Sequence, residues 1–267
     1  MCRLFGYFSQ FAGRPAALSQ RDHSFVQLSE THRDGWGLAY YEQSEDLPRV
    51  KLKRALLPAF QDPDFAALSE SLETRALIAH LRLATIGENS LNNNHPFSYQ
   101  NWIFAHNGNI KHFDRYRALI LSQIDPHFRA AIQGETDSEL IFYYLLSELE
   151  RWGLVSAQYP HSSRELGRSL KWALENLLAL IGPFSKQTGP PSETYISFLL
   201  SNGKALWAHQ GGQPLYYRLE PGAEGRAWDE IVFCSEPVGS PEDWQAMSTG
   251  DLMAVDQAIQ LVSIRGY

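Results

Sequence analysis

The chain has few cysteines and lacks the long apolar runs that mark secreted and membrane proteins. Among its 267 residues only Cys2 and Cys234 are cysteines, too few for a disulfide framework, so we expect a reducing compartment. No apolar run approaches the roughly 20 residues that a membrane-spanning helix needs. Polar residues, including Gln10 and Arg14, interrupt the first segment before an apolar core develops, which argues against a secretory signal. The sequence therefore predicts a cytoplasmic protein without membrane contact.

Clustered positive charge and metal-binding spacings are also missing. The formal net charge is −7 and no basic stripe occurs, so nucleic acid is not an expected partner. The nine histidines contain no H-x-x-x-H motif, and no C-x-x-C motif occurs, so no metal site is expected. Hydrophobic residues make up 44% and charged residues 20%, values typical of a compact globular protein.

Apolar periodicity predicts strands at both ends of the chain and helices in the middle. Short runs bounded by turn formers predict strands at residues 2–8, 37–41, 50–53, 76–82, 102–106, 195–201, 205–209, 215–219, 231–234, 252–256 and 258–262. Helical spacing predicts helices at residues 64–72, 113–124, 137–152 and 164–180, the third capped by Thr136 or Asp137. This order favours antiparallel sheets with helices on their outer faces, a layered α+β arrangement.

The connections fit a single compact unit. Asn202-Gly203 predicts a hairpin turn, because both residues tolerate positive φ. Residues 182–193 contain three prolines and are expected to form an exposed loop. Neither a repeat nor an obvious linker divides the chain, so we expect one domain over residues 2–267.

Cys2 is the most informative residue. An initiator methionine is normally removed when the next residue is small, which would place a thiol and a free α-amine on Cys2. The α-amine has a reference pKa of roughly 7.7–8.0, so its neutral fraction can accept the thiol proton directly or through a water. Taken alone, Cys2 is more often a small buried side chain, and Cys234, inside an apolar run, is expected to be one.

Six short motifs follow one another after this cysteine. They are Cys2-Arg3-Leu4-Phe5-Gly6-Tyr7, His32-Arg33-Asp34-Gly35-Trp36-Gly37, His80-Leu81-Arg82-Leu83-Ala84-Thr85, Asn94-His95-Pro96-Phe97, His106-Asn107-Gly108 and Gly134-Glu135-Thr136-Asp137-Ser138-Glu139. In this order the chain resembles the class II glutamine amidotransferases, above all their stand-alone members, essentially from end to end. The resemblance implies an N-terminal-nucleophile hydrolase, a four-layer αββα sandwich with two mainly antiparallel sheets.

The resemblance assigns groups to the two charged ends of a glutamyl substrate. Arg82 would hold the α-carboxylate, since a guanidinium can form a bidentate fork. Asp137 would hold the α-ammonium, although a plain helix cap is the competing interpretation. Thr85 and His95 belong to the same substrate-binding set. A departure from the family is Leu83, where several amidotransferases carry tryptophan, so the resemblance does not extend to coupling with a distant synthetase site.

The remaining motifs are assigned to catalysis and support. The Asn107 side-chain amide and the Gly108 backbone N–H would form an oxyanion hole, supplied by a turn after the strand at 102–106. Arg33 and Gly35 would support the pocket floor.

The resemblance implies no metal or organic cofactor. Three functions are compatible with it. The protein could be a glutaminase that passes ammonia to a separate synthetase subunit. It could instead hydrolyse a γ-glutamyl bond in a larger compound, with a peptidase subunit as a conceivable partner. In both cases Cys2 would form a γ-glutamyl thioester. The third is an inactive γ-glutamyl-binding or scaffold subunit, against which the intact Cys2, Asn107 and Asp137 argue.

Overall fold

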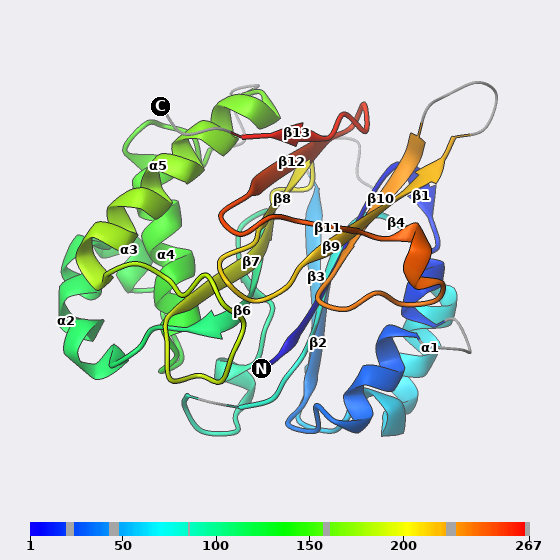
Figure 1. Cartoon of the computed structure of the whole chain (residues 1–267), viewed down its shortest axis with the longest axis horizontal. Coiled ribbons are helices and arrows are strands. Elements are labelled where there is room, and N and C mark those ends of the chain that lie inside the picture. Colours follow the sequence, from blue (N-terminus) through cyan, green and yellow to red (C-terminus); the bar gives the residue numbers. More distant parts are fainter. Residues whose placement is uncertain (20–23, 43–47, 85, 157–160, 223–227, 265–267) are drawn as a thin grey trace.

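The computed structural model describes residues 1–19, 24–42, 48–84, 86–156, 161–222 and 228–264, and these form two antiparallel sheets with helices outside them (Figure 1). The larger, seven-stranded sheet has the order β11-β9-β10-β1-β4-β2-β3. Its strands are β1 (Arg3–Gly13), β2 (Trp36–Glu42), β3 (Arg49–Ala55), β4 (Thr74–Leu81), β9 (Tyr216–Pro221), β10 (Trp228–Cys234) and β11 (Gln245–Ala246).

The second, six-stranded sheet has the order β13-β12-β8-β7-β6-β5. Its strands are β5 (Phe97–Tyr99), β6 (Trp102–Asn109), β7 (Tyr195–Ser201), β8 (Ala205–His209), β12 (Leu252–Asp256) and β13 (Val262–Ser263). The helices α2 (Phe113–Gln123), α3 (Pro126–Arg129), α4 (Asp137–Glu150) and α5 (Ser163–Ile181) lie on the outer side of this sheet, and α1 (Pro63–Ser71) lies outside the larger one (Figure 1).

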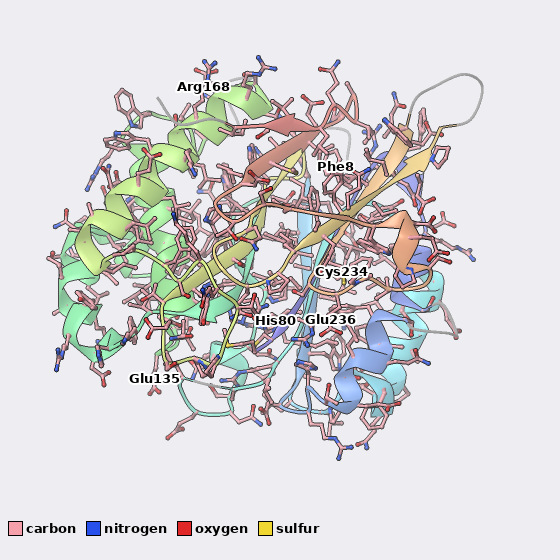
Figure 2. All side chains as sticks on the ribbon, viewed as in Figure 1. Phe8, His80, Glu135, Arg168, Cys234 and Glu236 are labelled. Carbon is pink, nitrogen blue, oxygen red and sulfur yellow. The ribbon has the colours of Figure 1, made fainter. Side chains whose placement is uncertain are left out.

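Alternation along β1 explains why both faces of the larger sheet are covered. Successive side chains of a strand point to opposite faces. Leu4 and Phe8 pack between the two sheets, whereas Phe5 and Tyr7 pack on the other face, in the cluster that includes Phe65 of α1. Figure 2 shows the side chains that fill these layers, with Phe8 labelled. The four-layer α+β sandwich expected from the sequence is therefore confirmed.

Most predicted elements are present with small shifts at their ends. Three strands, β7, β8 and β12, have the predicted bounds, and α4 begins at Asp137 with the Thr136 side chain accepting from the Glu139 N–H. Thr136, and not Asp137, is therefore the cap. Residues 183–194 form neither helix nor strand, as expected of the loop.

Two details of the sequence prediction are wrong. Residues 258–261 turn instead of forming a strand, with Ile259 at φ 51° and its N–H bonded to Asp256 O. The other is β6, which continues through Asn107 and Gly108, where a turn was expected. The hairpin predicted at Asn202-Gly203 joins β7 and β8, although only Gly203 has positive φ, because the Asn202 carboxamide oxygen accepts from two backbone N–H groups and holds a wider turn.

Candidate active site

A small cavity lies where β1 and α4 begin and β4 and β6 end. Its volume is about 20 Å³. The lining residues are Cys2, Arg82, Leu83, Ala84, Ile86, Asn93, His95, His106, Gly108, Thr136, Asp137 and Ser138. Of the predicted site residues, the cavity brings together Cys2, Arg82, His95, Gly108 and Asp137. Asn107 is not among the lining residues, and Thr85 lies outside the described residues.

The Cys2 thiol is held against the backbone of Leu83. The Leu83 N–H donates to Cys2 Sγ at 3.3 Å, and the thiol lies 3.3 Å from Leu83 O, to which it can donate its proton. Burial raises the pKa of the Cys2 thiol, opposed by the hydrogen bond from Leu83 and by the positive charge of Arg82 and Arg3. The sulfur is therefore held as a thiol and needs a base before it can attack.

The Arg82 guanidinium is buried, and its own loop holds it. Nη1 donates to the Asn89 carboxamide oxygen at 2.9 Å and Nη2 donates to Glu88 O at 3.1 Å. The Arg82 backbone is tied to the 32–35 segment, its N–H donating to Gly35 O and its carbonyl accepting from Asp34. A substrate carboxylate would have to replace the two neutral acceptors, the Asn89 carboxamide oxygen and Glu88 O. Its negative charge favours this exchange, because hydrogen bonds between a guanidinium and a carboxylate are stronger than those to a neutral acceptor.

Asp137 is a buried carboxylate at the first turn of α4. One oxygen accepts from the Ile110 N–H at 2.6 Å and the other from the Ser138 N–H at 2.8 Å. Burial raises the pKa of Asp137 to about 6, although these hydrogen bonds oppose the shift. At neutral pH the carboxylate is mostly ionised, and among the described residues no ion pair is formed by it, so it can receive an ammonium.

The strand register directs the Gly108 backbone away from β7. Gly108 lies opposite Ile196, whose N–H donates instead to Gly211 O on the other side of β7. Gly108 and Ile196 are therefore a non-hydrogen-bonded pair of the antiparallel ladder. In such a pair the backbone N–H and C=O groups of each residue point away from the partner strand, so the Gly108 N–H points away from β7, toward the free edge of β6. Pairing with β5 covers β6 only from Trp102 to Phe104, which leaves this edge open at the cavity.

Glycine is required at this position. A Cβ on Gly108 would overlap Tyr195 O and His106 Nε2. The Asn107 side chain lies on the opposite face of β6 from the position of a Gly108 side chain. The Asn107 backbone pairs with Ser197, so only the Asn107 side chain could bind a substrate. The Asn107 side chain is buried, and its Oδ1 has no hydrogen-bond partner among the described residues.

Ser138 and His106 form a hydrogen-bonded pair beside Asp137. His106 Nε2 lies 3.0 Å from Tyr195 O, which can only accept, so Nε2 carries the proton. Nδ1 then accepts from the Ser138 hydroxyl at 2.9 Å. Burial lowers the pKa of His106 to about 4, which keeps the ring neutral. Ser138 was not singled out from the sequence, although it follows Asp137 in the motif that was.

His95 lines the cavity, and its ring lies against the tilted ring of His80 behind it. Their ring centroids are 4.2 Å apart, and their ring nitrogens have no hydrogen-bond partner in the described part of the chain. Burial lowers the pKa of both rings well below the ordinary value. The neutral His95 ring therefore forms part of the cavity wall without adding charge.

The 32–35 segment supports the cavity through its backbone, because Asp34 and Gly35 are hydrogen-bonded to the backbone of Arg82. Gly35 has φ 129°, and a side chain there would strike Ala55 O at 2.5 Å. The Arg33 side chain is exposed, donating to Glu30 O and lying over the Phe60 ring, so it does not form the pocket floor.

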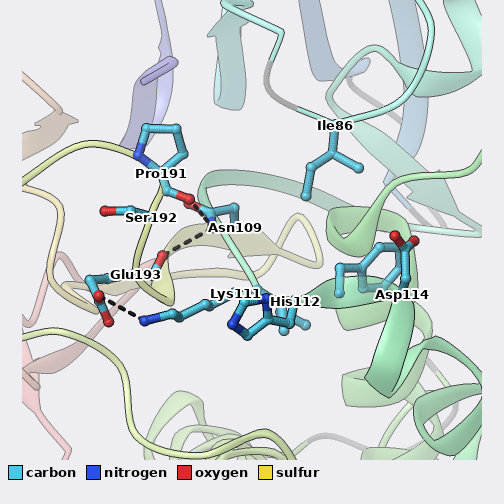
Figure 3. A pocket seen from close by; sticks show the side chains of 10 residues that line it. Ile86, Asn109, Lys111, His112, Asp114, Pro191, Ser192 and Glu193 are labelled. Carbon is cyan, nitrogen blue, oxygen red and sulfur yellow. Dashed lines mark hydrogen bonds and ion pairs between the residues drawn. The ribbon is translucent and has the colours of Figure 1, made fainter.

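A wider groove adjoins the cavity at Ile86 (Figure 3). It has a volume of about 720 Å³ and lies between the start of α2 and residues 191–193. Lys111 and Glu193 form an ion pair of 2.9 Å in it, and Asn109 holds the carbonyls of Pro191 and Glu193 (Figure 3). Ile110, whose N–H binds Asp137, also lines this groove, so the groove borders the end of the cavity where Asp137 lies.

Two classes of feature do not occur among the described residues. No group of three or more His, Cys, Asp or Glu side chains is placed to hold a metal ion. None of the helices described has both the length and the apolar character needed to cross a membrane.

Comparison with known proteins identifies the family. The model of the class II glutamine amidotransferases matches residues 1–230. A putative glutamine amidotransferase of Haemophilus influenzae is 30% identical, the alignment covering 90% of this chain and 79% of that protein. The probable glutamine amidotransferase DUG3 of Saccharomyces cerevisiae is 38% identical over 45% of this chain, an alignment that spans 34% of the yeast protein.

Two further similarities bear on activity and fold. A γ-glutamyl-hercynylcysteine sulfoxide hydrolase of Mycolicibacterium smegmatis is 32% identical over 86% of this chain and 81% of that protein. The solved structure of a class II glutamine aminotransferase domain protein from Silicibacter pomeroyi superposes with a TM-score of 0.64, at 22% identity, over 99% of both chains. This protein belongs to the class II glutamine amidotransferases.

Proposed function

We propose that this enzyme cleaves the γ-amide of a glutamyl substrate through a thioester on Cys2. The observation that carries the proposal is the shared cavity, in which a thiol, a guanidinium, a carboxylate and an outward backbone N–H meet. Arg82 would bind the α-carboxylate and Asp137 the α-ammonium. These two groups orient the γ-amide carbon toward Cys2 Sγ, so that a bimolecular attack becomes an intramolecular one.

The acylation step begins at the α-amine that removal of Met1 frees. The amine takes the thiol proton, and Sγ attacks the γ-carbonyl carbon, so that a C–S bond forms and the carbonyl oxygen becomes negative. The Gly108 N–H and the Asn107 amide donate to this oxygen, each donor being worth about 3–4 kcal/mol of barrier. The amine then protonates the departing nitrogen, and the thioester remains.

Deacylation uses the same groups in reverse. A water that has lost a proton to the α-amine attacks the thioester carbon. The C–S bond breaks, and glutamate leaves as the thiol regains a proton. Every proton moves between the Cys2 residue, the substrate and water, so this chain's own residues suffice for the cycle.

The leaving group distinguishes two candidate substrates. Arg82 and Asp137 would recognise only the glutamyl end, which glutamine shares with every γ-glutamyl compound. The Mycolicibacterium relative, named for hydrolysis of a γ-glutamyl compound, supports the larger class. With glutamine, the released ammonia could pass to a separate synthetase subunit.

A substrate panel tests the proposal. The protein, with removal of Met1 verified by mass, is assayed for glutamate release from glutamine and from γ-glutamyl dipeptides, with Cys2→Ala as the control. We expect glutamate release that requires Cys2, and the ratio of turnover numbers identifies the physiological class. Release that persists in Cys2→Ala would overturn the thioester route, and no release from any compound would favour the inactive scaffold.

A further inference from the structure

His32 is the buried histidine beside Cys2 to which the proposed mechanism gives no task. Its Nδ1 lies 2.6 Å from Leu28 O and 3.0 Å from the Thr31 hydroxyl, and its Nε2 lies 2.9 Å from Met1 O. Because the side chain is buried, at 4% exposure, its ring nitrogens have little contact with bulk water.

Both ring nitrogens of His32 face carbonyl oxygens, which can only accept, and a neutral ring can donate to only one of them. The shorter contact, 2.6 Å to Leu28 O against 2.9 Å to Met1 O, favours Nδ1 as the donor. Nε2 is then an acceptor, and while Met1 is present it faces the Met1 carbonyl oxygen, from which it can receive no proton.

Removal of Met1 changes what the ring faces. Standard peptide dimensions place the Cys2 nitrogen about 2.3 Å from Met1 O. His32 Nε2 therefore lies at most about 5 Å from the nitrogen that becomes the free α-amine, an upper limit that allows one bridging water or, if the two groups approach, a direct bond. An unfavourable acceptor pair is thus replaced by an acceptor and a donor.

We propose that His32 is the positioning residue of the catalytic base: its Nε2 accepts a hydrogen bond from the free α-amine of Cys2 and thereby directs the amine lone pair at the thiol. The inference rests on the proposed function, because it needs the amine as the base. His32 touches no reacting atom of the substrate and acts through the amine.

This hydrogen bond also stabilises the reactive charge state. When the proton moves from Sγ to the amine, a thiolate and an ammonium form, and a neutral imidazole acceptor favours the ammonium. The charged and titratable groups that face His32 are Arg3, His80 and the chain's amino group. Burial, and then the positive charge of Arg3, lower the pKa of His32, so the ring is neutral where the enzyme would work. Arg3 is itself paired with Glu236, which limits its effect.

Substitution at position 32 gives the first test. His32→Phe keeps the ring size without an acceptor, and His32→Gln restores an acceptor near the place of Nε2. With Met1 removal verified by mass, we expect His32→Phe to lower kcat at least tenfold with little change in KM, and His32→Gln to recover part of it. His127→Phe, on α3 and not among the residues that line the cavity, is the matched control.

The pattern of failure separates this inference from the proposed function. If the wild-type enzyme is not alkylated at Cys2 by the diazoketone analogue of glutamine, the proposed function fails. If wild type is alkylated and His32→Phe reacts at the same rate with the same pH profile, only the role of His32 is overturned.

Nitrogen NMR of the wild-type enzyme keeps the inference testable should His32→Phe not fold. In ¹⁵N-histidine-labelled protein without Met1, we expect His32 to be the neutral tautomer with the proton on Nδ1 and Nε2 shifted as a hydrogen-bond acceptor. A proton on Nε2 at neutral pH would contradict the proposal, whatever the variants show.

Discussion

Asp137 sets the pH range in which the proposed site can bind a substrate. Its carboxylate keeps two backbone hydrogen bonds, yet burial prevails and holds its pKa at about 6. A carboxylic acid cannot pair with an ammonium, so binding should weaken once the group is protonated.

We therefore predict that KM rises as the pH falls through about 6, while kcat changes less. The pKa of Asp137 is raised, so the charged form that binds substrate is present above about 6 and is lost below it. Steady-state kinetics between pH 5 and pH 8 would show this. Asp137→Asn should have a high KM throughout, and the exposed Asp125→Asn should behave as wild type. A KM that does not depend on pH in wild type would exclude the carboxylate as the ammonium partner.

Individual site residues differ in how far the sequence could predict them. Cys2, Arg82 and Asp137 stand out because each carries distinctive chemistry within an ordered motif. The contact between His32 and the Met1 carbonyl depends on how a short 3-10 helix (Phe25–Glu30) returns to the chain terminus. No local pattern contains that geometry, so the position of His32 could only be seen in the structure.

The loop after β4 decides whether Arg82 is available. Asn89 and Glu88 O occupy the guanidinium, and the cavity of about 20 Å³ has room for little more than a water. A glutamyl group can enter only if these contacts are exchanged and the cavity widens.

Removing the competing acceptor should favour the substrate. We predict that Asn89→Ala lowers KM by a few-fold at unchanged kcat, because the substrate carboxylate no longer displaces the Asn89 amide. Ser90→Ala, in the same loop, is the control and should leave KM unchanged. A higher KM in Asn89→Ala would mean that Asn89 itself helps to hold the substrate.

Strands and helices with strong periodicity were predictable, and their exceptions have physical causes. The helix α4 was predicted to its first residue because its apolar spacing and its Thr136 cap agree. The Asn107-Gly108 step looks like a turn locally, but long-range pairing with β7 extends β6 through it. Local propensity cannot predict pairing with a strand that is distant in the sequence. Here the pairing with β7 determines the direction of the Gly108 N–H.

At the scale of the whole molecule, the contact between the two sheets is one of the buried apolar layers that stabilise the fold. Leu199 of β7 is fully buried there, close to Gly6 of β1. We predict that Leu199→Ala lowers the free energy of unfolding by about 2–5 kcal/mol, since it leaves a cavity between the layers.

Urea titration of the folded enzyme would measure this loss. Leu119→Ala, at a half-exposed leucine on α2, should change stability by about 0.5 kcal/mol or less. The kcat of the folded fraction of Leu199→Ala should stay near that of wild type, because no cavity residue changes. Equal effects of the two substitutions would show that burial of Leu199 between the sheets does not stabilise the fold.

In the proposed mechanism, the freed amine of Cys2 activates the thiol of the same residue. The most direct measurement compares the chain that retains Met1 with the same chain after an aminopeptidase has removed it, each treated with the diazoketone analogue of glutamine. Intact mass and peptide mapping report alkylation at Cys2. We expect rapid alkylation only after Met1 is removed, and equal rates for the two forms would show that the freed amine does not activate the thiol.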